Sequence, residues 1–137
     1  MMKYVTGLNA LNLGERDDTP GDWHYSALDW ERPMILDTER SPFGAQGVGL
    51  EDVPGRGIVP TANHVRACLD LIEQGYFSDA QGMRENFISN ESHTPEILQA
   101  VWALRERGNW PAIDRFMGRE YLTSWLVFKR SQLLRQE

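Results

Sequence analysis

Residues 21–30 bring together side chains that can do chemistry. The segment holds three aromatic residues, one histidine and two carboxylates. A histidine close to a carboxylate, as His24 is to Asp22, is a pairing used in general acid–base catalysis. The rings of Trp23 and Trp30 can frame a flat ligand or anchor a partner. Asp22 and His24 are therefore candidate catalytic residues, and all four are candidate contacts for a ligand or partner.

The backbone conformation of this segment decides which side chains face solvent. On a strand, Trp23 would point to one face, with Asp22 and His24 on the other. On a helix, Trp23 and Trp30 would share one stripe, with Asp22 as the cap. Both patterns bury Trp23. We therefore expect first an aromatic anchor between the two halves of the chain. A ligand or catalytic role for His24, or a partner contact, remain the alternatives.

Acidic residues are concentrated in the N-terminal half. The chain has a formal net charge of −6, and residues 1–62 carry five basic against ten acidic side chains. Such a surface repels phosphate backbones, so nucleic acid is an unfavourable partner. We expect Asp17, Asp18, Asp22 and Glu51 to face a basic protein surface instead.

Two arginines on separate predicted helices, Arg84 and Arg119, are candidate ligand contacts. A guanidinium can clamp a phosphate or a carboxylate with paired hydrogen bonds. The alternative is that both lie on solvated helix faces or in pairs between helices.

Other common site chemistries find no support in the sequence. His24, His64 and His93 are not at helical ligand spacing, so we expect no metal, and no motif indicates a cofactor. Cys68 is the sole cysteine, which excludes an internal disulfide. Its position in a helical pattern predicts a small buried hydrophobe.

The bulk composition is that of one globular domain. The chain has 137 residues, of which 41% are hydrophobic. It contains no apolar run of about 20 residues, and its first residues lack the apolar stretch of a secretory signal. We therefore expect a cytoplasmic protein without a membrane segment.

Glycine and proline divide the chain into two parts. Residues 1–62 hold eight of the twelve glycines and five of the seven prolines, which is typical of short strands and turns. Apolar or β-branched runs predict strands at 4–6 and 34–36. A hairpin is predicted from 47–50 and 57–59 around the turn Pro54-Gly55.

Residues 63–137 show the helical period. Helices are predicted over 63–75 with Asn63 as N-cap and Gly75 after the end, over 78–88, from Thr94 to Gly108, and over 111–134. The last has a broad apolar arc, which predicts a central helix contacted on more than one side. The expected fold is α+β, one domain with an irregular strand-rich N-terminal half against about four helices.

Several short motifs suggest a family. The stretches Tyr-Val-Thr-Gly with Ala-Leu-Asn at 4–12, and Gly-Asp-Trp-His with Ser-Ala-Leu and Trp at 21–30, resemble a family of small uncharacterised bacterial proteins on mobile elements. The likeness extends through Ala-Gln-Gly-Met at 80–83 and the terminal helix. It implies a bacterial or phage-borne accessory protein near toxin–antitoxin or defence genes, and it carries over no catalytic residue.

These observations favour a small non-enzymatic factor that binds another protein through its acidic N-terminal surface, of an antitoxin-like, immunity or anti-defence type. The alternative is a small enzyme or nucleotide-binding domain with a cleft between the two halves. There His24 would act as acid or base, Asp22 would orient it, and Arg84 or Arg119 would hold an anion.

Overall fold

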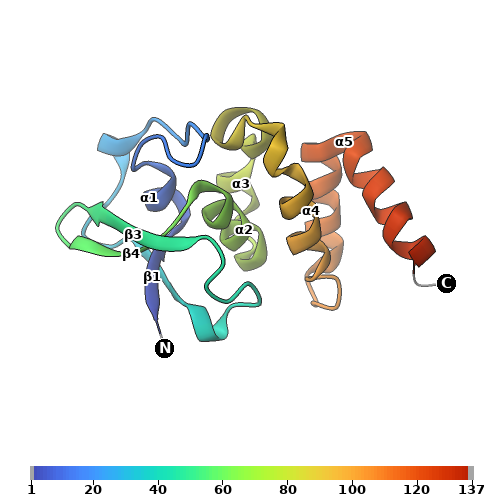
Figure 1. Ribbon diagram of the computed structural model, residues 1–137, viewed down its shortest axis with the longest axis horizontal. Helices are drawn as coiled ribbons and strands as arrows, with labels where there is room; N and C mark the ends of the chain where they lie inside the picture. Colours follow the sequence, from blue (N-terminus) through green and yellow to red (C-terminus); the bar gives the residue numbers. More distant parts are fainter. Residues whose placement is uncertain (1, 136–137) are drawn as a thin grey trace.

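Four strands form one mixed sheet in the N-terminal half, and helices make up the C-terminal half, which gives an α+β fold (Figure 1). The computed structural model describes residues 2–135. The strands are β1 (Lys3–Thr6), β2 (Met34–Asp37), β3 (Val48–Val53) and β4 (Gly57–Ala62), in the order β2-β1-β4-β3. β1 pairs antiparallel with β2 and parallel with β4, and β3 and β4 form a hairpin. The predicted strands and hairpin are confirmed.

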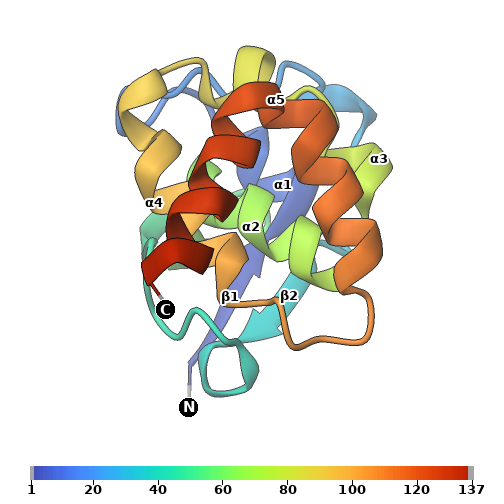
Figure 2. The same ribbon diagram turned by 90° about the vertical axis from the view of Figure 1, so that its right-hand side faces the viewer.

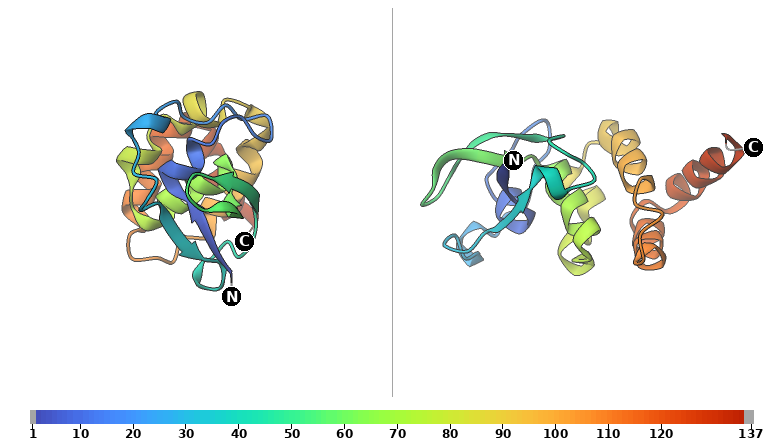
Figure 3. Two further views of the ribbon diagram at one scale, coloured as in Figure 1. Left: turned by 90° about the vertical axis from the view of Figure 1, so that its left-hand side faces the viewer. Right: turned by 90° about the horizontal axis from the view of Figure 1, so that it is seen from below.

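The helices run from the sheet towards the opposite end of the molecule. They are α1 (Gly7–Leu11), α2 (His64–Gln74), α3 (Phe77–Ala80), α4 (Thr94–Trp102) and α5 (Trp110–Arg135). The sheet and α1 lie at one end, α2 and α3 in the middle, and α4 and α5 at the other end (Figures 1 and 3). Within residues 2–135, no helix has the length and apolar character needed to cross a membrane.

The helix α2 has the ends that its sequence predicts. The Asn63 side chain accepts a hydrogen bond from the backbone N–H of Arg66 at 2.8 Å, and Gly75 ends the helix with φ of 85°. Nine of its eleven residues are buried, Cys68 among them, as expected for a helix packed on several sides.

The predicted helix over 78–88 is wrong. α3 ends at Ala80, and residues Met83–Ile88 form a separate π-helical segment. The break lies at Gly82, whose φ of 85° is the left-handed conformation that glycine adopts readily. The next helix begins at Thr94 as predicted but ends at Trp102 instead of Gly108, because the following turns tighten to i→i−3 hydrogen bonds.

α5 is not one continuous helix. Leu122 has φ of 50° and ψ of −127°, and this kink divides it into a first arm (110–121) and a second arm (123–135). Figure 2 shows the two arms as an inverted V, with the second arm in red. The apolar arc is broad because each arm buries its own side, the second arm through Trp125 and Phe128. The prediction of a single central helix is therefore corrected.

A buried ion pair joins α2 to the sheet. Arg66 and Asp70 are 1% and 0% exposed, and the Arg66 Nε lies 3.0 Å from Asp70 Oδ1. The hydroxyls of Tyr4 and Thr6, both on β1, donate to Asp70 Oδ2 at 2.7 Å. The Arg66 guanidinium also donates to the hydroxyl of Ser41 at 3.0 Å. Almost every polar atom of the pair is thus satisfied, as a buried charge requires.

We predict that Asp70→Asn lowers the free energy of unfolding by about 3–5 kcal/mol, because it leaves the Arg66 guanidinium buried without a counter-charge. Urea denaturation measures the loss. The matched control is Glu106→Gln, the same chemical change at an exposed site, which should stay within about 0.5 kcal/mol of wild type. Equal effects of the two substitutions would show that the pair carries little of the stability.

Candidate functional site

Backbone hydrogen bonds hold Gly21, at the start of segment 21–30, in place. Its N–H donates to the carbonyl of Phe87 at 2.9 Å, and the N–H of Asp22 donates to the carbonyl of Leu11 at 2.8 Å. Gly21 has φ of 74°, and a Cβ atom there would lie 2.6 Å from the Leu11 oxygen and 2.7 Å from His64 Cε1. The backbone of Gly21 therefore contacts the helical half directly, and only glycine fits at this position.

The imidazole of His64 lies beneath this glycine. His64 is fully buried, and its Nδ1 lies 2.7 Å from the hydroxyl oxygen of Thr19. Within residues 2–135 its Nε2 has no hydrogen-bond partner. Burial, together with the positive charge of Arg16, lowers the pKa of His64 to about 4. The ring is therefore neutral at neutral pH.

Short hydrogen bonds shape the turn that follows. Asp22 Oδ1 lies 2.7 Å from His24 Nδ1 and accepts from the N–H of Trp23 at 2.8 Å. The Asn12 side chain accepts from the N–H of His24 at 2.6 Å and donates to Asp22 Oδ2 at 3.4 Å. These bonds occupy the inward side of the turn.

The indole of Trp23 consequently points into solvent, 75% exposed, and the prediction that it is buried is wrong. Trp30 is half-buried instead. Its Nε1 donates to the carbonyl of Tyr25 at 2.9 Å, and the two rings lie 4.8 Å apart. Trp30 therefore closes the segment on itself, and neither tryptophan joins the two halves.

Trp23 lies between two open hollows of about 610 Å³ each. The first is lined by Asn12, Leu13, Gly14, Asp22, Trp23, Tyr25, Asp52 and Pro54. The second lies where the two halves meet and is lined by Leu8, Asp22, Trp23, His24, Ser78, Asp79, Gln81, Glu85, Asn86 and Phe87. Among these residues there are four carboxylates and no lysine or arginine. The surroundings of Trp23 are therefore negative.

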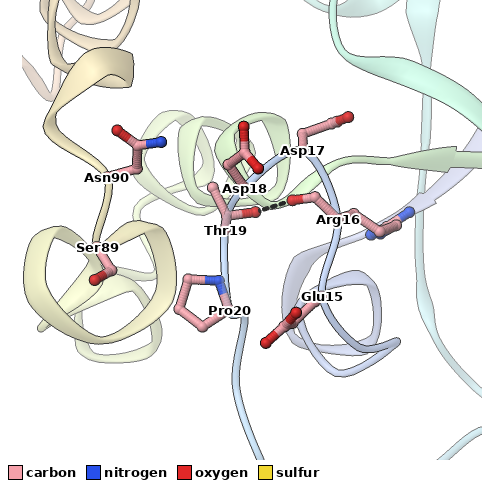
Figure 4. A pocket seen from close by; sticks show the side chains of 8 residues that line it. All are labelled: Glu15, Arg16, Asp17, Asp18, Thr19, Pro20, Ser89 and Asn90. Carbon is pink, nitrogen blue, oxygen red and sulfur yellow. Dashed lines mark hydrogen bonds between the residues drawn. The ribbon is translucent and has the colours of Figure 1, made fainter.

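A third hollow continues the acidic surface (Figure 4). Its lining includes Glu15, Asp17 and Asp18, with Ser89 and Asn90 opposite. Arg16 also lines this hollow, but its guanidinium turns away to donate to the carbonyls of Ala10 and Ala62 and lies 3.3 Å from Glu51. Asp17 and Asp18 are exposed, whereas Glu51 is half-buried and pairs with Arg16.

The two candidate arginines do not join this site. Arg84 Nε lies 3.1 Å from Glu91 Oε1, and its guanidinium lies 5.2 Å from the centre of the Tyr121 ring. Arg119 is exposed on the first arm of α5. Neither arginine lines the hollows beside Trp23, so within residues 2–135 neither of them faces His24 as an anion clamp.

Among the described residues that line the two hollows beside Trp23, Asp22 and His24 form the one pair with catalytic chemistry. Ser78 lines the same hollow, but no hydrogen bond connects its hydroxyl to His24 within the described chain. Across residues 2–135 there is also no group of three or more His, Cys, Asp or Glu side chains arranged to hold a metal ion.

Sequence reasoning missed part of this site. Asp79 and Glu85 reach the hollow from α3 and the π-helical segment, and Asp52 comes from β3. Their positions depend on the break at Gly82 and on the hairpin, and no local pattern links them to Trp23.

Comparisons with protein-family models, with curated proteins and with solved structures give no match.

We predict that Gly21→Ala destabilises the protein by about 2 kcal/mol more than Gly55→Ala. Both glycines have a positive φ, 74° and 77°, so the backbone strain is similar. A Cβ at Gly55 meets open space, whereas at Gly21 it meets the Leu11 carbonyl and the His64 ring. Urea denaturation of both variants checks this, and equal losses would contradict the close approach.

His64 should make stability fall in acid. Its pKa is about 4 in the folded protein against 6.5 in the unfolded chain, so the unfolded state takes up the proton first. The resulting loss in the free energy of unfolding is absent above about pH 6.5, grows as the pH falls, and reaches about 3 kcal/mol near pH 4. Urea denaturation at a series of pH values should show a shallower decline for His64→Gln than for wild type, and parallel curves would contradict it.

Proposed function

We propose that this protein is a small non-enzymatic factor that binds another protein, with the acidic surface around Trp23 facing a basic partner. The observation that carries this proposal is the solvent-facing indole of Trp23, 75% exposed between two hollows whose lining residues include four carboxylates and neither lysine nor arginine. Tryptophan is among the residues that contribute most to protein interfaces.

Hydrogen bonds hold the backbone that carries this indole. The backbone of residues 21–24 is fixed by hydrogen bonds to Leu11, Asn12 and Phe87. A fixed backbone reduces the entropy that binding must overcome. The exposed ring therefore projects from a backbone of fixed conformation.

The charges around the ring indicate the chemistry of the partner. Asp22, Asp52, Asp79 and Glu85 surround Trp23. An arginine or lysine can stack over an indole while it pairs with neighbouring carboxylates. Asp17 and Asp18 on the same loop extend the negative field and speed association with a basic surface.

Small size, this acidic surface and the resemblance of the sequence motifs to mobile-element proteins support an antitoxin-like, immunity or anti-defence role in a bacterial or phage setting. In such a role the partner is neutralised by contact, and no catalytic group is required.

The alternative function is a small enzyme or nucleotide-binding domain, and the observation in its favour is the 2.7 Å contact between His24 and Asp22 in a hollow between the two halves. The carboxylates of Asp22, Asp79 and Glu85 in the same hollow repel a phosphate group. A nucleotide is thus less well matched to this site than a cationic side chain.

We predict that Trp23→Ala loses the partner. Tagged wild type, Trp23→Ala and Tyr76→Ala are purified from the native host at low salt, and bound proteins are quantified by mass spectrometry. Tyr76 is a matched control because it is an aromatic residue, 49% exposed, that is not among the residues lining the acidic hollows. Wild type and Tyr76→Ala should recover the same basic protein, and Trp23→Ala should recover about tenfold less.

The same purification is repeated at higher salt. Recovery by wild type should fall at about 0.5 M salt, because screening weakens pairs between exposed charges. The proposal fails if wild type is recovered alone at low salt, or if Trp23→Ala retains the same partner.

A further inference from the structure

The second arm of α5 is held rigidly from its inner side. Trp125 stacks on Phe128 at 5.8 Å and lies 6.0 Å from Trp110 on the first arm. Asp114, also on the first arm, accepts hydrogen bonds at 2.8 Å from Trp125 Nε1 and Lys129 Nζ. The opposite side of the second arm therefore faces outward in a fixed orientation, at the end of the molecule far from the sheet (Figures 2 and 3).

This outward side is apolar. Leu126, Val127, Leu133 and Leu134 are 59%, 62%, 56% and 64% exposed. Residues three and four positions apart are neighbours on a helix surface, so these four side chains surround Arg130. We call these five residues the Arg130 patch. Contiguous exposed apolar side chains of this kind mark interaction sites.

Arg130 is the distinctive member of the patch. It is exposed, and within residues 2–135 it has no hydrogen bond or ion pair. If a partner covers the four aliphatic side chains, the guanidinium between them loses its water. A buried guanidinium without a counter-charge is strongly unfavourable, so the partner must bring a carboxylate to this point.

The charge of the surrounding helix favours the same partner. Residues 121–135 contain Lys129, Arg130 and Arg135 and no acidic residue. A second copy of this chain placed two-fold about Arg130 would set that arginine against its own equivalent. An anionic lipid surface would attract the arm but repel a chain whose net charge is −6. A protein helix with a carboxylate within an apolar face matches both the aliphatic side chains of the patch and the charge of Arg130.

We propose that the Arg130 patch is a docking surface for an amphipathic helix of a partner protein that carries one aspartate or glutamate at the centre of its apolar face. Helices pack through side chains at three- and four-residue spacing, which is the spacing of the patch. This surface is separate from the acidic surface around Trp23, so it does not depend on the function proposed above.

The test uses designed peptides. Three peptides of about 18 residues carry leucines at helical spacing with glutamate, glutamine or arginine at the centre of the apolar face. Binding to the full chain is measured by fluorescence anisotropy. The glutamate peptide should bind about tenfold more tightly than the glutamine peptide, because it forms a charge-assisted pair with Arg130.

Charge reversal makes the test specific. Arg130→Glu should lose the glutamate peptide and gain the arginine peptide, whereas Arg119→Glu, the same change at an exposed site on the first arm, should behave as wild type. Thermal unfolding checks that both variants fold. The proposal is overturned if the glutamate peptide does not bind, if the glutamate and glutamine peptides bind equally, or if Arg130→Glu changes nothing.

Competing occupants give distinct results. Dimerisation of wild type in sedimentation experiments that Leu126→Glu abolishes would assign the patch to a second copy and overturn the proposal. Binding to vesicles of anionic phospholipid that Arg130→Glu and Leu126→Glu both abolish would assign it to a lipid surface, with the same consequence.

Discussion

The buried ion pair of Arg66 and Asp70 is the interaction on which the rest of the structure depends. Removing two charges from water costs several kcal/mol each, and the cost is offset only where every remaining polar atom is bonded. Here the partners come from separate parts of the chain, Tyr4 and Thr6 on β1 and the carbonyl of Gln46 before β3. The pair is satisfied in one orientation of α2 against the sheet, so it fixes that orientation.

The orientation of α2 in turn determines the path of the loop that carries the acidic surface. His64 is the first residue of α2, and its buried ring lies under Thr19 and Gly21. Because Gly21 has no side chain, the loop passes directly over this ring and reaches the carbonyls of Leu11 and Phe87. The following residues bond inward, and the indole of Trp23 is left outside. A contact deep in the core thus determines the exposure of a surface residue.

Local patterns in the sequence are sufficient for the four strands and for α2, but not for the candidate site. The period, cap and terminal glycine of α2 lie within twelve or so consecutive residues, and each acts through neighbouring backbone groups. The exposure of Trp23 depends instead on Asn12 and on the carbonyl of Phe87, which lies far along the chain. Hydrophobicity favours a buried tryptophan, and no pattern in residues 21–30 reveals these distant hydrogen bonds.

The kink in α5 is likewise absent from the local pattern. The apolar residues of 111–134 predict one helix surrounded by core, but the kink at Leu122 gives the second arm its own buried side, formed by Trp125 and Phe128. The leucines and valine around Arg130 are then left in water. Trp23 lies among carboxylates, and Arg130 lies among aliphatic side chains. In both places hydrogen bonds on the side that faces the core hold the backbone that carries these exposed groups. A rigid backbone loses less conformational entropy on binding. More of the favourable free energy of burying the apolar groups therefore contributes to association.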